Sequence, residues 1–244
     1  MGLFNKLFGH SEKIEKTIET HHQQDEIICK TEQELLERFG GNAFDKQIDL
    51  GEVIGNNNWN VDMTKEEISF GTNIVFPIQV LGTFSHSSET WLWAWANSKS
   101  GLSDNIIQQA LQLKKYGEEN EIDFLRNSQF DTIKNDLHLI GLIASGMFNS
   151  SGYYIADYGQ GAMVLTIKSE KIDKIHKDDH LRILTVFPQL ISQFEMNHYL
   201  ALINYLTDKG YSISKSETKI SAIKNGNTIT AEFDEQSRLT KLNG

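Results

Sequence analysis

The chain has 244 residues, of which 39% are hydrophobic and 23% are charged, and its formal net charge is −10. This composition supports a packed core and excludes global disorder. The negative charge disfavours contact with phosphate backbones, so we expect no nucleic acid partner. Cys29 is the only cysteine, which excludes an intrachain disulfide and indicates a reducing compartment, the cytoplasm.

The N-terminal part reads as helical. The apolar stretch within residues 1–9 is too short for the core of a signal peptide. Nowhere do about 18 apolar residues run together, so we expect no membrane span. Residues 11–39 carry apolar side chains at helical spacing, which predicts a long helix ended by Gly40 and Gly41. Thr31 and Glu34 form a capping-box pattern, so a break into two helices near Lys30 is the alternative.

Residues 59–97 alternate between apolar and more polar side chains, as an antiparallel β-meander does. Residues 71–73 suit a hairpin loop, and residues 85–88 suit a second one. Pro77 donates no backbone hydrogen bond, so the strand should face an edge or a bulge there.

The most distinctive segment is Thr90–Asn97, whose three indoles all point to one side if it is a single strand. Three exposed indoles would form an unusually large apolar patch. Helices therefore cover this face, or it partly lines a pocket. A loop over 85–88 places Val80 opposite Trp93, and a slip of one residue places Leu81 there. We expect Trp93 to be buried, and Trp91 to border solvent or a ligand.

Further elements follow from caps and breakers. Residues 103–117 predict a helix that Gly117 stops, and residues 131–148 predict a buried helix. Residues 153–157 and 162–167 predict a hairpin. Pro188 suits the first turn of a short helix.

The end of the chain predicts a helix from Asn197 to Gly210 and then three short strands. Asn225-Gly226 is a strong type I′ turn signal. This turn pairs Ala222 with Ile229 and Ile220 with Ala231, which places the apolar residues on one face. The fold class is therefore α+β: an antiparallel β-meander packed with helices, plus a C-terminal three-stranded β-meander.

We expect one domain over residues 1–244. Within it, residues 1–41 form an N-terminal helical segment, residues 42–210 carry the Trp-bearing sheet and its helices, and residues 211–244 form the C-terminal meander.

Metal binding has one weak signal, His176 and His180 at a spacing of four. Asp178 and Asp179, between them, are equally good caps for a following helix. The lysines nearby would oppose a dication: Lys168, Lys171, Lys174 and Lys177. We therefore predict no metal.

Catalytic motifs are not found. Gly159-Gln-Gly161 joins two strands, whereas a dinucleotide loop joins a strand to a helix. Ser145 lacks the glycine context of a nucleophile elbow. Cys29, beside apolar residues on the predicted helix, reads as a buried and inert thiol. We predict no catalytic residues and no cofactor.

Two segments together, Val80–Ser85 and Thr90–Asn97, resemble an uncharacterised family of bacterial domains of unknown function. Other parts are similar to the same family, so that the resemblance covers most of the chain: Trp59–Asp62, Ile68–Gly71, Gly152–Tyr154 and residues 233–244. The resemblance implies a bacterial, cytoplasmic, single-unit protein. It implies no activity, ligand or catalytic residue.

Two functional hypotheses remain open. The first is a non-enzymatic cytoplasmic binding or interaction protein, with an antitoxin-like immunity protein as its specific form, because the chain is acidic and lacks a catalytic motif. The second is an enzyme or small-molecule-binding protein with an aromatic-lined pocket. Its ligand-binding residues would be Trp91, Trp95, Tyr153, Tyr154 and Asp157. An enclosed cavity with titratable side chains would favour the second hypothesis.

Overall fold

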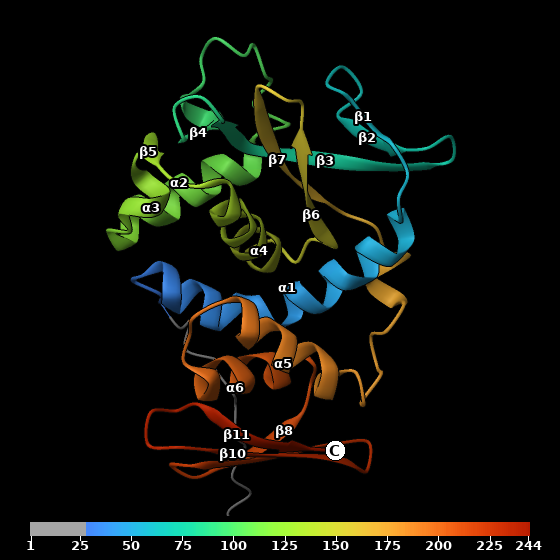
Figure 1. Cartoon of the computed structure of the whole chain (residues 1–244), viewed down its shortest axis with the longest axis vertical. Coiled ribbons are helices and arrows are strands. Elements are labelled where there is room, and N and C mark those ends of the chain that lie inside the picture. The colour runs from blue at the N-terminus through green and yellow to red at the C-terminus, as the bar shows by residue number, and fades with distance from the viewer. Residues whose placement is uncertain (1–27) are drawn as a thin grey trace, which may run out of the picture.

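The computed structural model describes residues 28–244, so residues 11–27 of the helix predicted over 11–39 lie outside the described residues. Helix α1 (Glu32–Ile54) crosses the middle of the molecule. On one side of it lie helix α4 (Leu137–Met147) and a seven-stranded sheet. On the other side lie helices α5 (Ile183–Gln193) and α6 (His198–Asp208), followed by a four-stranded sheet (Figure 1). The predicted α+β class is confirmed.

The prediction of one uninterrupted helix is wrong at residues 28–31, which are not helical, and α1 begins where the alternative of a break near Lys30 places it. The Thr31 side chain accepts a hydrogen bond from the backbone N–H of Glu34, as an N-cap does. The prediction that Gly40 and Gly41 end the helix is wrong, because α1 runs through both to Ile54. A β-carbon on residue 41 would overlap the Tyr205 side chain. Gly41 is therefore a contact surface for α6 rather than a stop.

The larger sheet is antiparallel and is built around the long strand β3 (Ile74–Ser85). Its strand order runs β1-β2-β3-β4-β5, and β7 also pairs with β3 and with β6. The predicted loop over residues 71–73 and the predicted hairpin of β6 and β7 are confirmed. The remaining strands are β1 (Trp59–Asp62), β2 (Glu67–Phe70), β4 (Thr90–Trp93), β5 (Gln129–Asp131), β6 (Gly152–Asp157) and β7 (Gly161–Ile167).

The Trp segment is shorter as a strand than predicted. β4 ends at Trp93, and the 3-10 turn η1 (Ala94–Ala96) carries Trp95 away from it. Trp93 is buried as expected, but the expectation that Trp91 borders solvent is wrong, because its exposed fraction is 0%.

The predicted register of β4 is also wrong, because Gly82 pairs with Trp93. The reason is the turn, which lies one residue later than predicted and places Glu89 at a positive φ of 49°. Gly82 leaves room for an indole: a β-carbon there would come within 2.5 Å of the Trp91 ring.

Three further helices cover the sheet or flank it: α2 (Gln108–Asn120), α3 (Asp123–Arg126) and α4. The prediction that Gly117 stops α2 is wrong. A β-carbon on Gly117 would come within 2.5 Å of Leu125 in α3. This glycine therefore lies inside α2 and lets α3 pack closely against it. Cys29 is buried as predicted but lies just before α1, not on a helix. Two short 3-10 turns complete this part: η2 (Lys134–Asp136) and η3 (Ile172–Lys174).

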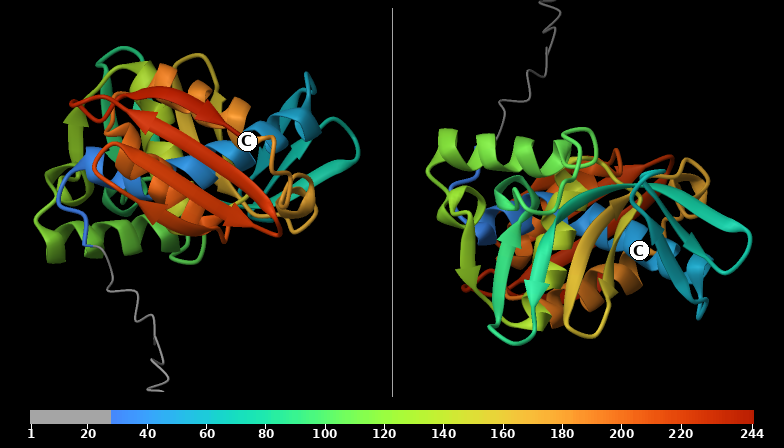
Figure 2. Two further views of the ribbon diagram at one scale, coloured as in Figure 1. Left: turned by 90° about the horizontal axis from the view of Figure 1, so that it is seen from below. Right: turned by 90° about the horizontal axis from the view of Figure 1, so that it is seen from above.

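The C-terminal sheet lies over α5 and α6, as Figure 2 shows from below. It has four strands rather than the predicted three: β8 (Ser212–Lys215), β9 (Lys219–Lys224), β10 (Asn227–Phe233) and β11 (Leu239–Asn243). The Asn225-Gly226 turn is confirmed, and so are its pairs Ala222 with Ile229 and Ile220 with Ala231.

Two helix starts before this sheet have different outcomes. Asn197 caps α6 as predicted, since its side chain accepts from the Leu200 N–H. The prediction for Pro188 is wrong, because it lies inside α5, which begins at Ile183. Asp179 explains the earlier start: its carboxylate accepts from the N–H groups of Leu181 and Arg182.

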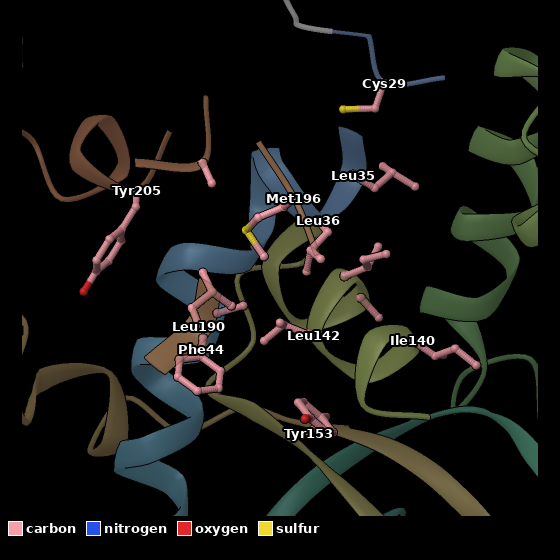
Figure 3. Close-up of a cluster of buried hydrophobic side chains, with 14 of the residues drawn as sticks. Cys29, Leu35, Leu36, Phe44, Ile140, Leu142, Tyr153, Leu190, Met196 and Tyr205 are labelled. Carbon is pink, nitrogen blue, oxygen red and sulfur yellow. The ribbon is translucent and has the colours of Figure 1, made fainter. Parts of the chain in front are cut away.

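One hydrophobic cluster extends from the Trp strand through α1 to the C-terminal sheet. Figure 3 shows its centre, where Leu36 and Phe44 of α1, Leu142 of α4 and Leu190 of α5 come together. The single-domain organisation stays a prediction. Within residues 28–244, no helix has the length and apolar character needed to cross a membrane.

The two glycines Gly41 and Gly51 of α1 give a matched test of this packing. We expect Gly41→Ala to lower the free energy of unfolding by about 1–3 kcal/mol, because its methyl group overlaps Tyr205. Gly51 has open space around it, so Gly51→Ala should raise the free energy of unfolding by up to about 1 kcal/mol. Urea melts measure both. Equal effects would contradict the close approach of α1 and α6.

Candidate functional site

The five residues predicted from the sequence to bind a ligand lie in different surroundings. Trp91 and Tyr153 are buried in one hydrophobic cluster, and Tyr154 packs at the edge of a second one, near Trp59. Trp95 lies under the Lys114 ammonium group, which is 4.7 Å from its ring centroid. Asp157 lies at the end of β6.

Asp157 is held in polar contacts there: its carboxylate contacts Lys134 at 2.6 Å and His86 at 3.2 Å. The Lys134 hydrogen bond, the Gly159 N–H and His86 lower the pKa of Asp157. None of the five residues lines the pocket described next. Their role in ligand binding stays a prediction.

A polar pocket of about 390 Å³ lies where α1 and the end of α6 meet the segment 170–177. Five of its lining residues are acidic and five are lysines, so its charges are nearly balanced. The lining residues are Asn42, Asp45, Lys46, Asp49, Asn149, Glu170, Asp173, Lys174, His176, Lys177, Asp208, Lys209 and Lys224.

The inner wall of this pocket is a network of buried charges. Arg182 forms ion pairs with both Asp45 and Asp49, which lie one turn apart on α1. Asp45 also accepts from Lys209 at 2.5 Å and from the Tyr205 hydroxyl at 2.8 Å. All four charged side chains are at most 10% exposed. Isolated charges would be very costly at this depth, so the mutual pairing is what allows their burial.

The pocket shifts the protonation equilibria of four of its side chains. Burial raises the pKa of Asp49, against the His176 hydrogen bond and the Arg182 charge. Burial also raises the pKa of Asp208, against the charge of Arg38. Burial lowers the pKa of Lys46, against the charge of Asp173. Desolvation therefore dominates at Asp49, Asp208 and Lys46. At Asp173, in contrast, hydrogen bonds with Lys168 and Ser151 and the charge of Lys46 lower the pKa despite its burial.

One group of side chains here has the composition of a metal site. Ligand atoms of Asp49, Glu52 and His176 lie within 4.8 Å of one another. The same Asp49 oxygen already contacts Arg182 and, at 2.7 Å, His176. His180 faces elsewhere and contacts the Tyr211 hydroxyl at 2.8 Å. The two histidines thus do not converge, and the absence of a metal stays a prediction.

A niche of about 10 Å³ adjoins the pocket and shares Asn42, Lys46, Asn149 and Asp208 with it. Ser145 of α4 contributes to its wall. This side chain is 1% exposed, and its hydroxyl has no hydrogen-bond partner among the described residues.

Sequence reasoning missed this site because it ended the first helix at Gly41. Asp45 and Asp49 follow that point at a spacing of four, which puts both on one helical face. If the predicted helix had been continued past Gly41, this pair of acidic residues among apolar neighbours would have been the signal for a buried polar site. The partners Arg182 and Lys209 are more than 130 residues away in the sequence and carry no local signal.

Comparison with family models shows that the chain belongs to DUF6882, a family of unknown function, because the family model matches residues 33–170, more than half of the chain. This finding confirms the resemblance to a family without an assigned function. Comparisons with curated proteins and with solved structures gave no match. The matched residues include α1 and α4, whereas His176, Arg182 and Lys209 lie beyond them.

The buried network predicts a large effect of one substitution. We expect Arg182→Met to lower the free energy of unfolding by about 3–5 kcal/mol, because two buried carboxylates lose a cationic partner. Arg126→Met removes an exposed ion pair to Asp123, and this control should cost at most about 1 kcal/mol. Denaturant melts at neutral pH measure both. Similar losses would mean that the network is not a stabilising element.

His138 predicts a dependence of stability on pH. Its ring lies 2.8 Å from the Tyr153 hydroxyl, and burial and the Lys134 charge lower its pKa. In the unfolded chain a histidine titrates near about pH 6.5. Below that pH the unfolded state binds a proton that the folded state resists, so the free energy of unfolding falls as pH falls.

We expect His138→Gln to weaken this fall. Urea melts of both proteins from pH 8 to pH 5 measure the slopes, and the difference at pH 8 gives the effect of the side chain itself. Identical slopes would contradict the prediction.

Proposed function

We propose that this protein binds a small polar molecule in the pocket between α1, α6 and segment 170–177. The observation that carries this proposal is the pocket itself: its volume of about 390 Å³ lies within the range of small-molecule sites, and ionised side chains from distant parts of the chain line it.

The energetics of the wall support the same proposal. Buried ion pairs are often no more stabilising than apolar side chains of the same volume. Clusters of desolvated titratable groups in a recess are typical of functional sites. Such a cluster lies at the pocket wall: Asp45, Asp49 and Lys209 line the pocket, and Arg182 pairs with both acids. A role in ligand binding gives a reason to keep charges where an apolar interface would also fold.

We propose further that the protein is a non-enzymatic binding protein of the bacterial cytoplasm. The single cysteine, Cys29, is buried, and burial raises the pKa of its thiol. Both features suit a reducing compartment, where such a thiol stays inert.

A second candidate is an interaction protein, with an antitoxin-like immunity role as its specific form. The supporting observation is the net charge of −10 together with the acidic end of α2, where Glu118, Glu119 and Glu121 are exposed. Such a surface suits a basic protein partner. Where a toxin gene adjoins this one, co-expression should relieve toxicity, and Glu118→Lys combined with Glu119→Lys should abolish the relief. Unchanged relief would count against this candidate.

The pocket proposal is tested by calorimetric titration with a panel of small polar molecules. We expect at least one to bind the wild type, and Lys177→Met, which removes a lysine from the pocket lining, to weaken it at least about tenfold, equal to about 1.4 kcal/mol. Lys115→Met on the exposed face of α2 is the matched control and should leave affinity unchanged. Binding that is insensitive to Lys177→Met, or no binding at all, would contradict the proposal.

A further inference from the structure

The Ser145 hydroxyl has no hydrogen-bond partner among the described residues, and the Ser145 side chain lines the niche beside the pocket. A serine inside a helix commonly bonds the carbonyl one turn back. Ser145 makes no such bond, although it is 1% exposed. A buried hydroxyl left unpaired is destabilising. The side chain therefore has a use that the packing of α4 does not explain.

The niche that Ser145 lines has room for one small polar group. Its volume of about 10 Å³ is close to that of a single water molecule. Its walls are tight, because a β-carbon on Gly146 would come within 2.5 Å of the Phe39 carbonyl oxygen. The niche shares four lining residues with the pocket. A molecule in the pocket can thus place one terminal atom beside Ser145.

The groups with unused capacity around the niche can all accept a hydrogen bond. The Asn42 side chain forms no hydrogen bond in the part of the chain that the structure describes, and Asp208 contacts only Nη1 of Arg38 there. Lys46, in contrast, already contacts Asn149, Ser150 and Asp173, which takes up its three donors. An ammonium group has three donors and a positive charge, so it matches the Ser145 hydroxyl, the Asn42 amide oxygen and the Asp208 carboxylate.

The outer end of the pocket has the opposite character. Lys177 forms no ion pair or hydrogen bond within residues 28–244, and its side chain is exposed at the rim. Lys174 lies beside it and pairs only with the exposed Glu170. An anionic group is the complement of these lysines.

We propose that the pocket binds an amino acid or a short peptide, with its ammonium group in the niche at Ser145 and its carboxylate toward Lys177. This inference rests on the proposed function and names the class of ligand.

The test is calorimetric titration with the standard free amino acids, each compared with its N-acetylated form, which lacks the ammonium group. Glucose and inorganic phosphate are probes of other classes. We expect at least one amino acid to bind, and acetylation to weaken it at least about tenfold. Ser145→Ala should weaken the free amino acid by a similar factor and leave the affinity of the acetylated form unchanged. Ser221→Ala, on the outer face of β9, is the matched control.

Folding is checked by the thermal midpoint, which Ser145→Ala should leave unchanged or raise, because no direct hydrogen bond is lost. A clearly lower midpoint, or equal weakening of both ligand forms, would overturn the niche assignment. Binding of glucose or phosphate without any amino acid would overturn the ligand class and leave the pocket proposal standing. No binding in any class would overturn both.

Discussion

The ion pairs of Arg182 with Asp45 and Asp49 join the two halves of the molecule. Helix α1 presents both carboxylates to the side that α5 and α6 cover. Tyr205 repeats the connection, since its hydroxyl bonds Asp45 while its side chain fills the space left by Gly41. A sliding of α6 along α1 would break the polar and the steric match together. The network therefore fixes where the helices cross, and the pocket lies at that crossing.

Elements set by local chemistry were predictable from the sequence. Asn225-Gly226 adopts the positive φ values that its turn needs, and this turn alone fixes the register of β9 and β10. Thr31 and Asn197 cap α1 and α6 through bonds to residues three positions ahead. In each case the deciding contacts lie within a few residues of the signal.

Elements set by distant contacts were not predictable. Gly41 and Gly117 were predicted as helix stops, because glycine often ends a helix. Each lies inside a helix instead, because a neighbouring helix occupies the space where a β-carbon would be. Trp93 was predicted as core and is buried, whereas Trp91, which was predicted to border solvent or a ligand, is buried as well. The pocket combines α1 with residues after 170, so no single stretch of sequence contains it.

The polar groups around α1 that face α5 and α6 differ in their hydrogen bonding from those that face α4. Toward α5 and α6 the two buried acids of the network are bonded: Asp45 has three partners and Asp49 has two. Toward α4 the Ser145 hydroxyl and the Asn42 amide have none among the described residues. A core selected for stability alone would carry alanine at position 145, because an unpaired buried hydroxyl costs about 1–3 kcal/mol. Proteins keep such costs where binding needs the group, and the unpaired side of α1 is the side on which the niche adjoins the pocket.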